Sequence, residues 1–206
     1  MITFYDRIIL AGYNPPDPLY EIEVENYEEL AIGSELFSSF RDENNNAELI
    51  QCCIQSVNKK WWVTPLKTNY GCYKRVQERC RIMKGETVKT GNHYLTYVKN
   101  DENSAQCYLR YKGHTKKVKV SFEENKAYKI GRNFVKNETE VVDDTISNFH
   151  FQIKYKDGKL YIEDAGMIID KPSVNGTWIK LEQKTVVLRS PVTLMLGTDT
   201  YLILQS

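Results

Sequence analysis

Residues 147–164 read SNFHFQIKYKDGKLYIED, and this stretch decides the fold class. Two runs rich in aromatic and β-branched residues flank Asp157-Gly158, a dipeptide typical of a tight turn between antiparallel strands. The runs alternate apolar and polar side chains, as strands do when one of their faces is buried. The stretch therefore predicts a β-hairpin with strands at Phe149–Tyr155 and Lys159–Glu163.

The sequence on either side of this hairpin predicts more strands and no helix. Short runs rich in β-branched and aromatic residues, bounded by turn residues, are found at Val118–Phe122, Tyr128–Ile130, Thr185–Leu188 and Thr200–Leu204. No segment shows a sustained helical period with capping residues. Many short strands with regular turns indicate an all-β fold built as an antiparallel β-sandwich.

The chain contains a long internal repeat. Residues 19–33, LYEIEVENYEELAIG, share their order of strand, acidic turn and Ile-Gly ending with residues 117–131, KVKVSFEENKAYKIG. A period of roughly 100 residues is too long for a solenoid repeat. It predicts two tandem antiparallel β-sandwiches, at residues 1–100 and 105–206, joined by the polar stretch Lys99–Ala105.

The composition excludes several classes of partner and cofactor. Lys and Arg number 28 against 27 Asp and Glu, and a net charge of +1 predicts no direct binding to nucleic acid or to an anionic membrane. No apolar stretch approaches the ~20 residues of a membrane helix. The first residues lack the pattern of a signal peptide, so we expect an intracellular protein, nuclear or cytoplasmic. The five cysteines form no CxxC pair, so neither a disulfide framework nor a metal site is expected, and no cofactor is implied.

Short polar motifs stand where strands of the second copy begin or end. They are Gly131-Arg132, Ser147 three residues before His150, and Asn175-Gly176-Thr177. Each is weak alone, but their order around a predicted sandwich is informative. A phosphothreonine carries about −1.5 to −2 charges and three acceptor oxygens, which suit a guanidinium, a hydroxyl and backbone N–H groups.

At these residues the chain resembles the forkhead-associated (FHA) family, whose loops hold a phosphothreonine peptide at one end of a β-sandwich. The resemblance implies that Arg132 and Ser147 contact the phosphate and that Asn148 lies beside it. It also implies that Asn175 holds the peptide backbone and that Thr177 completes the binding set. Structural support for the site is expected from the remaining motif residues, which are Gly131, His150 and Gly176.

This sequence departs from the family pattern in its binding loops. Asn148 stands where arginine is commonest, and Val174 stands where a threonine is frequent. Acidic residues gather in the loop before the Ser147 motif: Glu138, Glu140, Asp143 and Asp144. We expect these carboxylates to disfavour acidic peptide residues beyond the phosphothreonine.

The matching positions of the first copy lack the binding chemistry. Gly33 is followed by Ser34, the stretch Asn46–Ile50 has neither serine nor histidine, and Tyr70 stands in place of Asn175. We interpret residues 1–100 as a degenerate FHA-like copy, with an unrelated β-rich domain as the alternative.

These residues are compatible with three functions of unequal support. The leading prediction is a non-enzymatic module that binds phosphothreonine peptides as a signalling or assembly adaptor. The alternative is a scaffold subunit of a larger complex that uses both sandwiches for phosphorylation-independent contacts. An enzyme with Cys72 or Cys80 as nucleophile and His93 as base is not expected, because no catalytic motif accompanies these residues.

Overall fold

A computed structural model describes residues 6–11, 18–24, 29–33, 40–41, 52–66, 71–111, 113–132, 139–140, 143–165, 168, 173–182, 184–197 and 200–205. The chain divides into two compact units. The first unit combines Met1–Arg75 with Leu181–Ser206, and the second is Val76–Lys180. In sequence, the second unit is therefore inserted into the first.

The first unit is built from strands of both ends of the chain. Its described strands are β1 (Asp6–Ala11), β2 (Pro18–Val24), β3 (Glu29–Gly33), β4 (Phe40–Arg41), β5 (Cys52–Val57), β6 (Lys60–Pro65), β7 (Cys72–Arg75), β18 (Val186–Arg189), β19 (Val192–Leu196) and β20 (Thr200–Gln205). One sheet has the order β18-β6-β5-β3-β4, and the other strands follow the order β7-β19-β20-β1-β2.

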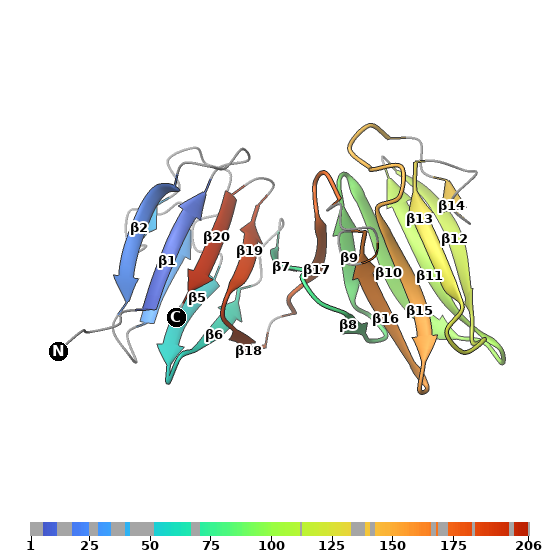
Figure 1. Cartoon of the computed structure of the whole chain (residues 1–206), viewed down its shortest axis with the longest axis horizontal. Helices are drawn as coiled ribbons and strands as arrows, with labels where there is room; N and C mark the ends of the chain where they lie inside the picture. Colours follow the sequence, from blue (N-terminus) through green and yellow to red (C-terminus); the bar gives the residue numbers. More distant parts are fainter. Residues whose placement is uncertain are drawn as a thin grey trace. The chain divides into compact units, whose positions relative to one another are not determined.

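The second unit is built from consecutive strands. Its described strands are β8 (Cys80–Ile82), β9 (Thr87–Thr90), β10 (His93–Asn100), β11 (Ser104–Tyr111), β12 (His114–Ser121), β13 (Ala127–Gly131), β14 (Thr139–Glu140), β15 (Phe151–Lys156), β16 (Lys159–Asp164) and β17 (Thr177–Lys180). One sheet has the order β14-β13-β15-β16-β8, and the other strands follow the order β12-β11-β10-β9-β17 (Figure 1). The hairpin predicted from residues 147–164 is β15 with β16.

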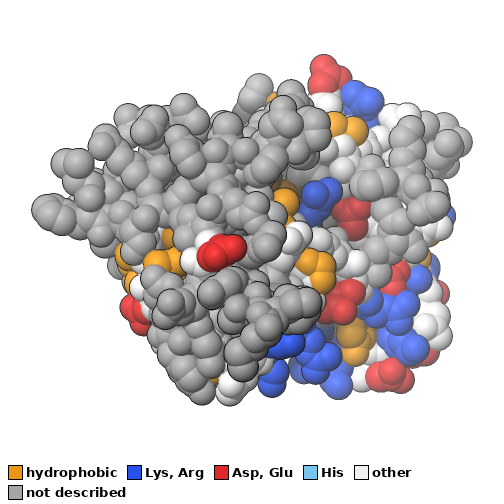
Figure 2. Space-filling view, turned by 60° about the vertical axis from the view of Figure 1, so that its left-hand side comes forward, with side chains coloured by type: hydrophobic (Ala, Val, Ile, Leu, Met, Phe, Trp, Pro, Cys, Tyr) orange, Lys and Arg blue, Asp and Glu red, His pale blue; other side chains and the backbone are white. Residues whose placement is uncertain are grey.

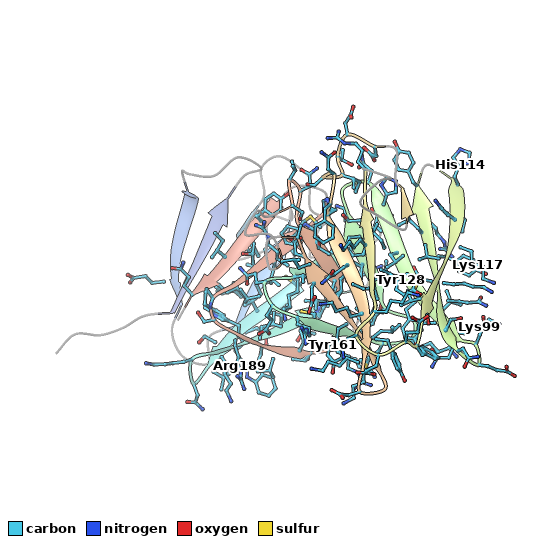
Figure 3. All side chains as sticks on the ribbon, turned by 45° about the vertical axis from the view of Figure 1, so that its right-hand side comes forward. Lys99, His114, Lys117, Tyr128, Tyr161 and Arg189 are labelled. Carbon is cyan, nitrogen blue, oxygen red and sulfur yellow. The ribbon has the colours of Figure 1, made fainter. Side chains whose placement is uncertain are left out.

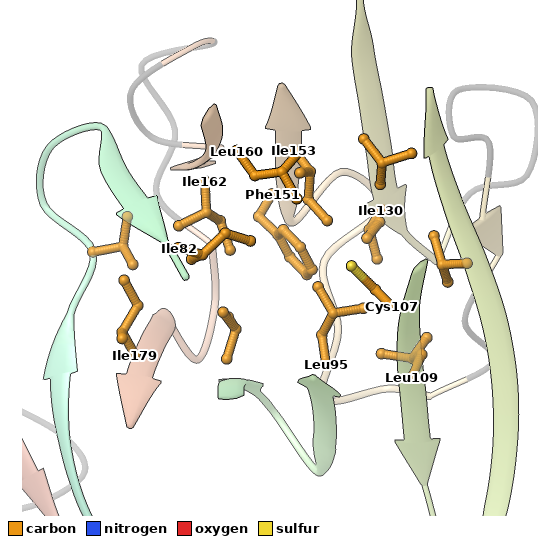
Figure 4. Close-up of a cluster of buried hydrophobic side chains, with 14 of the residues drawn as sticks. Ile82, Leu95, Cys107, Leu109, Ile130, Phe151, Ile153, Leu160, Ile162 and Ile179 are labelled. Carbon is orange, nitrogen blue, oxygen red and sulfur yellow. The ribbon is translucent and has the colours of Figure 1, made fainter. Parts of the chain in front are cut away.

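The predicted β-sandwich fold is confirmed, since most described residues are in strands, and these pair in the antiparallel sense except for β3 with β4 and β13 with β14. Apolar side chains from both sheets of the second unit fill the space between them (Figure 4). Leu95 and Cys107 come from one sheet, and Ile130, Phe151 and Ile162 come from the other. The first unit has a separate core that includes Trp61 and Leu194.

The two units share one plan of strand pairing. In the second unit β13 pairs with β15 and β9 with β17, and in the first unit β3 pairs with β5 and β19 with β7. Strand β10 lies beside β11 as β20 lies beside β1. By this correspondence, the first unit includes β18, β19 and β20 from the second half of the sequence. The second unit includes the equivalent strands β8, β9 and β10 from the first half.

The units divide the chain differently from the boundary expected at Lys99–Ala105. That stretch includes the turn between β10 and β11, which pair in the antiparallel sense from Tyr94↔Arg110 to Asn100↔Ala105. The Asp101 N–H donates to the Ser104 carbonyl at 2.7 Å, which closes the turn. A polar stretch of this composition suits a tight hairpin turn as well as a linker, because turn residues favour both.

The described surface carries mixed charge. Figure 2 shows Lys and Arg side chains beside Asp and Glu on one face, and Figure 3 shows His114 and Lys117 extending outward from β12. In the described part of the chain, no helix is long and apolar enough to cross a membrane. Among the same residues, no group of three or more His, Cys, Asp or Glu side chains is placed to hold a metal ion.

Candidate functional site

The end of β13 lies against the segment that leads into β15. A Cβ atom on Gly131 would lie 2.3 Å from the Asn148 carbonyl oxygen and 2.9 Å from the Phe149 Cα, so only glycine fits there. This close approach lets the Arg132 N–H donate to the Ser147 carbonyl at 3.0 Å. Gly131 thus brings the arginine and the serine of two separate motifs together.

The Ser147 side chain connects two loops. Its Oγ accepts a hydrogen bond of 2.9 Å from the backbone N–H of Val174, which immediately precedes Asn175. Among the residues that the structure describes, none accepts a hydrogen bond from this hydroxyl. A hydroxyl carries one proton to donate besides its lone pairs, so that proton is available to an acceptor such as a phosphate oxygen.

His150 holds the same loops from inside the unit. The fully buried ring accepts a hydrogen bond at Nδ1 from the Ser147 N–H at 3.0 Å, and its Nε2 lies 3.0 Å from the Gly176 carbonyl oxygen. Because Nδ1 accepts, the proton is on Nε2, which donates to Gly176. Burial lowers the pKa of His150, against the opposing effects of the Gly176 carbonyl and Asp164. The ring is a neutral structural bridge between the Ser147 and Asn175 motifs.

Asn175 faces the loop that carries Ser147. Its side-chain amide donates to the Thr145 carbonyl at 2.7 Å, and its own backbone carbonyl accepts from Trp178 Nε1 at 2.7 Å. Gly176 follows with φ +69°, a conformation that glycine adopts without steric cost. These bonds place the asparagine beside the serine loop.

Arg132 lies on the exposed side of this cluster. Its Nη1 is 2.9 Å from Asp144 Oδ1, and its Nε donates to Asn148 Oδ1 at 3.4 Å. The side chains of Arg132 and Asp144 are 42% and 101% exposed. Exposed ion pairs contribute only about 0–1 kcal/mol, so a doubly charged phosphate can compete with Asp144 for the guanidinium.

The prediction that Thr177 belongs to the binding set needs correction. Thr177 is fully buried, and its Oγ1 donates to Asp164 Oδ2 at 2.6 Å. The same carboxylate accepts hydrogen bonds from the backbone N–H and the hydroxyl of Ser173. Thr177 therefore supports the Asn175 turn from within and cannot contact a ligand.

Of the acidic residues expected to face a peptide, Asp144 is exposed, but the Asp143 side chain is almost fully buried and cannot do so. Asn148 is exposed beside Arg132, and Val174 is 74% exposed. Glu138 lies outside the described residues, and only the backbone of Glu140 is described. The cluster therefore presents a guanidinium, a hydroxyl and amides from three loops.

Sequence reasoning missed the residues that hold these loops. Thr145 supplies the carbonyl for Asn175, and Asp164 accepts from Ser173 and Thr177. The spacing of Ser173 and Thr177 on either side of Asn175-Gly176 resembles an ordinary turn, so only the position of Asp164 at the end of β16 hints at this network.

The three loops of this cluster lie within a segment that matches a known family. A sequence model of the FHA domain matches residues 128–197, which include Arg132, Ser147 and Asn175. Residues 128–197 are an FHA domain. FHA domains are protein-interaction modules, and phosphothreonine binding is typical of the family. The matched residues cross from the second unit into the first, because β18 and β19 belong to the first unit.

A search of solved structures adds one similar chain. The FHA domain of the CT664 protein from Chlamydia trachomatis is 21% identical, covers 48% of this chain and 92% of its own, and has a TM-score of 0.26. No curated protein matches the chain.

Proposed function

We propose that the FHA domain of this chain binds phosphothreonine peptides and acts as a signalling or assembly adaptor without enzymatic activity. The observation that carries the proposal is the hydrogen-bonded convergence of three loops: Arg132 on Ser147, Ser147 on Val174, and Asn175 on Thr145. Hydrogen bonds to a charged group contribute about 1.5–3 kcal/mol each. A few of them, less the cost of ordering the ligand, suit micromolar affinity, or about −8 kcal/mol.

In this proposal, Arg132 and Ser147 bind the phosphate, and Asn175 binds the peptide backbone. A planar guanidinium matches two phosphate oxygens, and the Ser147 hydroxyl can satisfy a third. An asparagine amide can pair with a peptide group through a donor and an acceptor. The proposed ligand is therefore an extended peptide with phosphothreonine, whatever its wider sequence.

The first test is a calorimetric titration with one peptide in phosphorylated and plain threonine forms. We expect binding of the phosphorylated form alone, and Arg132→Ala should weaken it about tenfold to hundredfold, as one or two lost charged hydrogen bonds imply. Arg110→Ala, which removes an exposed arginine from β11, is the matched control and should leave the affinity unchanged. Equal affinity for both peptide forms would exclude the proposal.

A second candidate function is phosphorylation-independent scaffolding of a larger complex. The Arg132–Asp144 pair favours it, because the guanidinium already has an anionic partner within the unit. Partner capture that persists after phosphatase treatment and in Arg132→Ala would support scaffolding and contradict phosphate recognition.

We also propose that residues 1–100 are a degenerate FHA-like copy that takes part in such contacts. The shared strand pairing supports this reading, as does the sequence Gly33-Ser34 where the second copy has Gly131-Arg132.

A further inference from the structure

The loop that carries the proposed phosphate contacts rests on a turn from the other half of the repeat. This turn, residues 90–93, joins β9 to β10. It lies in the second unit, where β9 pairs with β17 through Thr90↔Thr177. It is therefore adjacent to the strand that begins immediately after Asn175-Gly176.

Gly91 packs directly on Thr145. A Cβ atom at Gly91 would lie 2.3 Å from Thr145 Oγ1 and 2.9 Å from the Thr145 carbonyl oxygen. The next residue, Asn92, donates its backbone N–H to Thr145 Oγ1 at 3.3 Å. The carbonyl in this contact is the one that accepts the Asn175 amide. A chain of two contacts thus leads from Gly91 to the proposed peptide-holding side chain.

His93 supports the same loop from a second direction. Its ring stacks on Tyr111 with centroids 4.2 Å apart and an interplanar angle of 7°. Its Nδ1 lies 3.4 Å from Asp143 Oδ2, and both side chains are almost fully buried. Asp143 Oδ1 in turn accepts the Thr145 N–H at 2.8 Å. His93 and Gly91 therefore hold Thr145 between them.

The short connection between β10 and β11 explains why the turn of residues 90–93 lies in the same unit as the proposed phosphate-binding loops. Residues 101–103 are long enough for a hairpin, and antiparallel neighbours can be joined by so tight a turn. The connection carries β8, β9 and β10 into the unit of β11, where Val88 and Leu95 join its core. Strands β18 and β19 belong to the matched FHA sequence but lie in the first unit. In the second unit, β8 and β9 of the first copy occupy the equivalent positions.

We propose that the turn of residues 90–93 is a positioning element of the phosphothreonine site. In this arrangement the first copy, although it lacks the binding residues itself, completes the binding module formed by Val76–Lys180. The proposal rests on the phosphopeptide function for its affinity consequences. Its structural consequence, the position of Thr145 and Asn175, does not depend on any ligand.

Gly91→Ala in the full chain tests the positioning role. The new methyl group meets the Thr145 carbonyl, so we expect the phosphopeptide dissociation constant to rise on the order of tenfold, since binding groups must be held within about 0.5 Å. The matched control is Gly85→Ala, in the turn between β8 and β9. Gly85 also has positive φ, at +94°, but nothing lies within 4 Å of its added Cβ. Both variants carry backbone strain, and only Gly91→Ala displaces the loop.

A ligand-free readout separates this proposal from the function on which it rests. The NMR resonances of the Thr145 backbone amide and the Asn175 side-chain amide should shift in Gly91→Ala and stay in place in Gly85→Ala. If the unmodified protein binds no phosphopeptide, the proposed function fails, but these resonances still decide the positioning role. Identical resonances and affinities in the two variants would overturn it.

A second variant covers the case in which Gly91→Ala does not fold. His93→Phe keeps an aromatic ring for Tyr111 but removes the Nδ1 atom that faces Asp143. We expect a smaller shift of the same two resonances and a rise in the dissociation constant of about two- to fivefold, equivalent to less than 1.4 kcal/mol. Unchanged resonances in this variant would also count against the proposal.

Discussion

The two units use the same strand register but place different residues at its ends. Phe151 pairs with Asp164 in the second unit where Cys52 pairs with Pro65 in the first. Thr177 of β17 pairs with Thr90, and its counterpart in the first unit, Cys72 of β7, pairs with Leu196. A buried carboxylate and hydroxyl in one unit are thus replaced by a proline and a thiol in the other.

The difference shows that a buried carboxylate at this register position can hold the loop that precedes the closing strand of a sandwich. In the second unit Asp164 holds Ser173 and Thr177, which flank the Asn175 turn. In the first unit Cys52 and Cys72 are buried together. The hydrogen bond that the Cys52 thiol donates to Cys72, together with burial, raises the pKa of Cys52 well above its usual value. The Cys52 thiol is therefore an apolar packing group and a poor nucleophile.

The largest expected effect comes from removing the carboxylate of the second unit. Asp164→Ala leaves the buried donors of Ser173 and Thr177 without their acceptor, which should destabilise the second unit by about 3–5 kcal/mol. Amide hydrogen exchange, read separately for the two units, measures this loss. Pro65→Ala, at the same register position of the first unit, removes no hydrogen bond. If both variants cost the same stability, the contrast drawn between the units is wrong.

A smaller effect should appear as a pH dependence of the second unit that arises from its histidines. All three histidines of the chain, His93, His114 and His150, lie in Val76–Lys180. Burial lowers the pKa of His150, against the opposing Gly176 carbonyl and Asp164. Burial also lowers the pKa of His93, with Asp143 opposing and His150 adding to the shift.

The sign of this dependence follows from proton binding. Below about pH 6.5 the unfolded chain binds protons that the folded histidines resist, so stability falls as the pH decreases, by up to about 1.4 kcal/mol per pH unit for each group. Thermal unfolding between pH 7.5 and 5 measures the slope. His93→Phe should reduce it, and His114→Gln, at an exposed position, is the control. If His93→Phe leaves the slope of stability against pH unchanged, His93 does not contribute to the pH dependence.

The smallest effect should come from removing the charge of Asp144, which competes with the phosphate for Arg132. Asp144→Asn frees Arg132 from an exposed ion pair worth about 0–1 kcal/mol, so phosphopeptide affinity should rise by up to about fivefold. Asp157→Asn, in the hairpin turn between β15 and β16, removes the same charge away from the site and should have no effect. Calorimetry compares the two variants. Weaker binding in Asp144→Asn would show that the carboxylate organises the arginine instead of competing for it.

Much of the site was predictable because its motifs stand at strand ends. Arg132, Ser147 and Asn175 were identified from their order along the chain, and the structure brings them together. Thr177 was misassigned because a threonine after Asn-Gly has the same sequence whether it faces solvent or Asp164. The sequence offers His93 only as a candidate catalytic base, since nothing in it places the ring against Asp143.

The sequence by itself determined the β-sandwich fold, the internal repeat and the FHA motifs, because alternation, turn residues and short motifs are local properties. Only the tertiary structure decided that the last three strands of each copy pack in the unit formed mainly by the other copy. The last strand of one copy can lie beside the first strand of either copy, since β20 beside β1 and β10 beside β11 are equivalent pairings. The short turn at residues 101–103 favours the hairpin, and that choice carries Gly91 and His93 to the site.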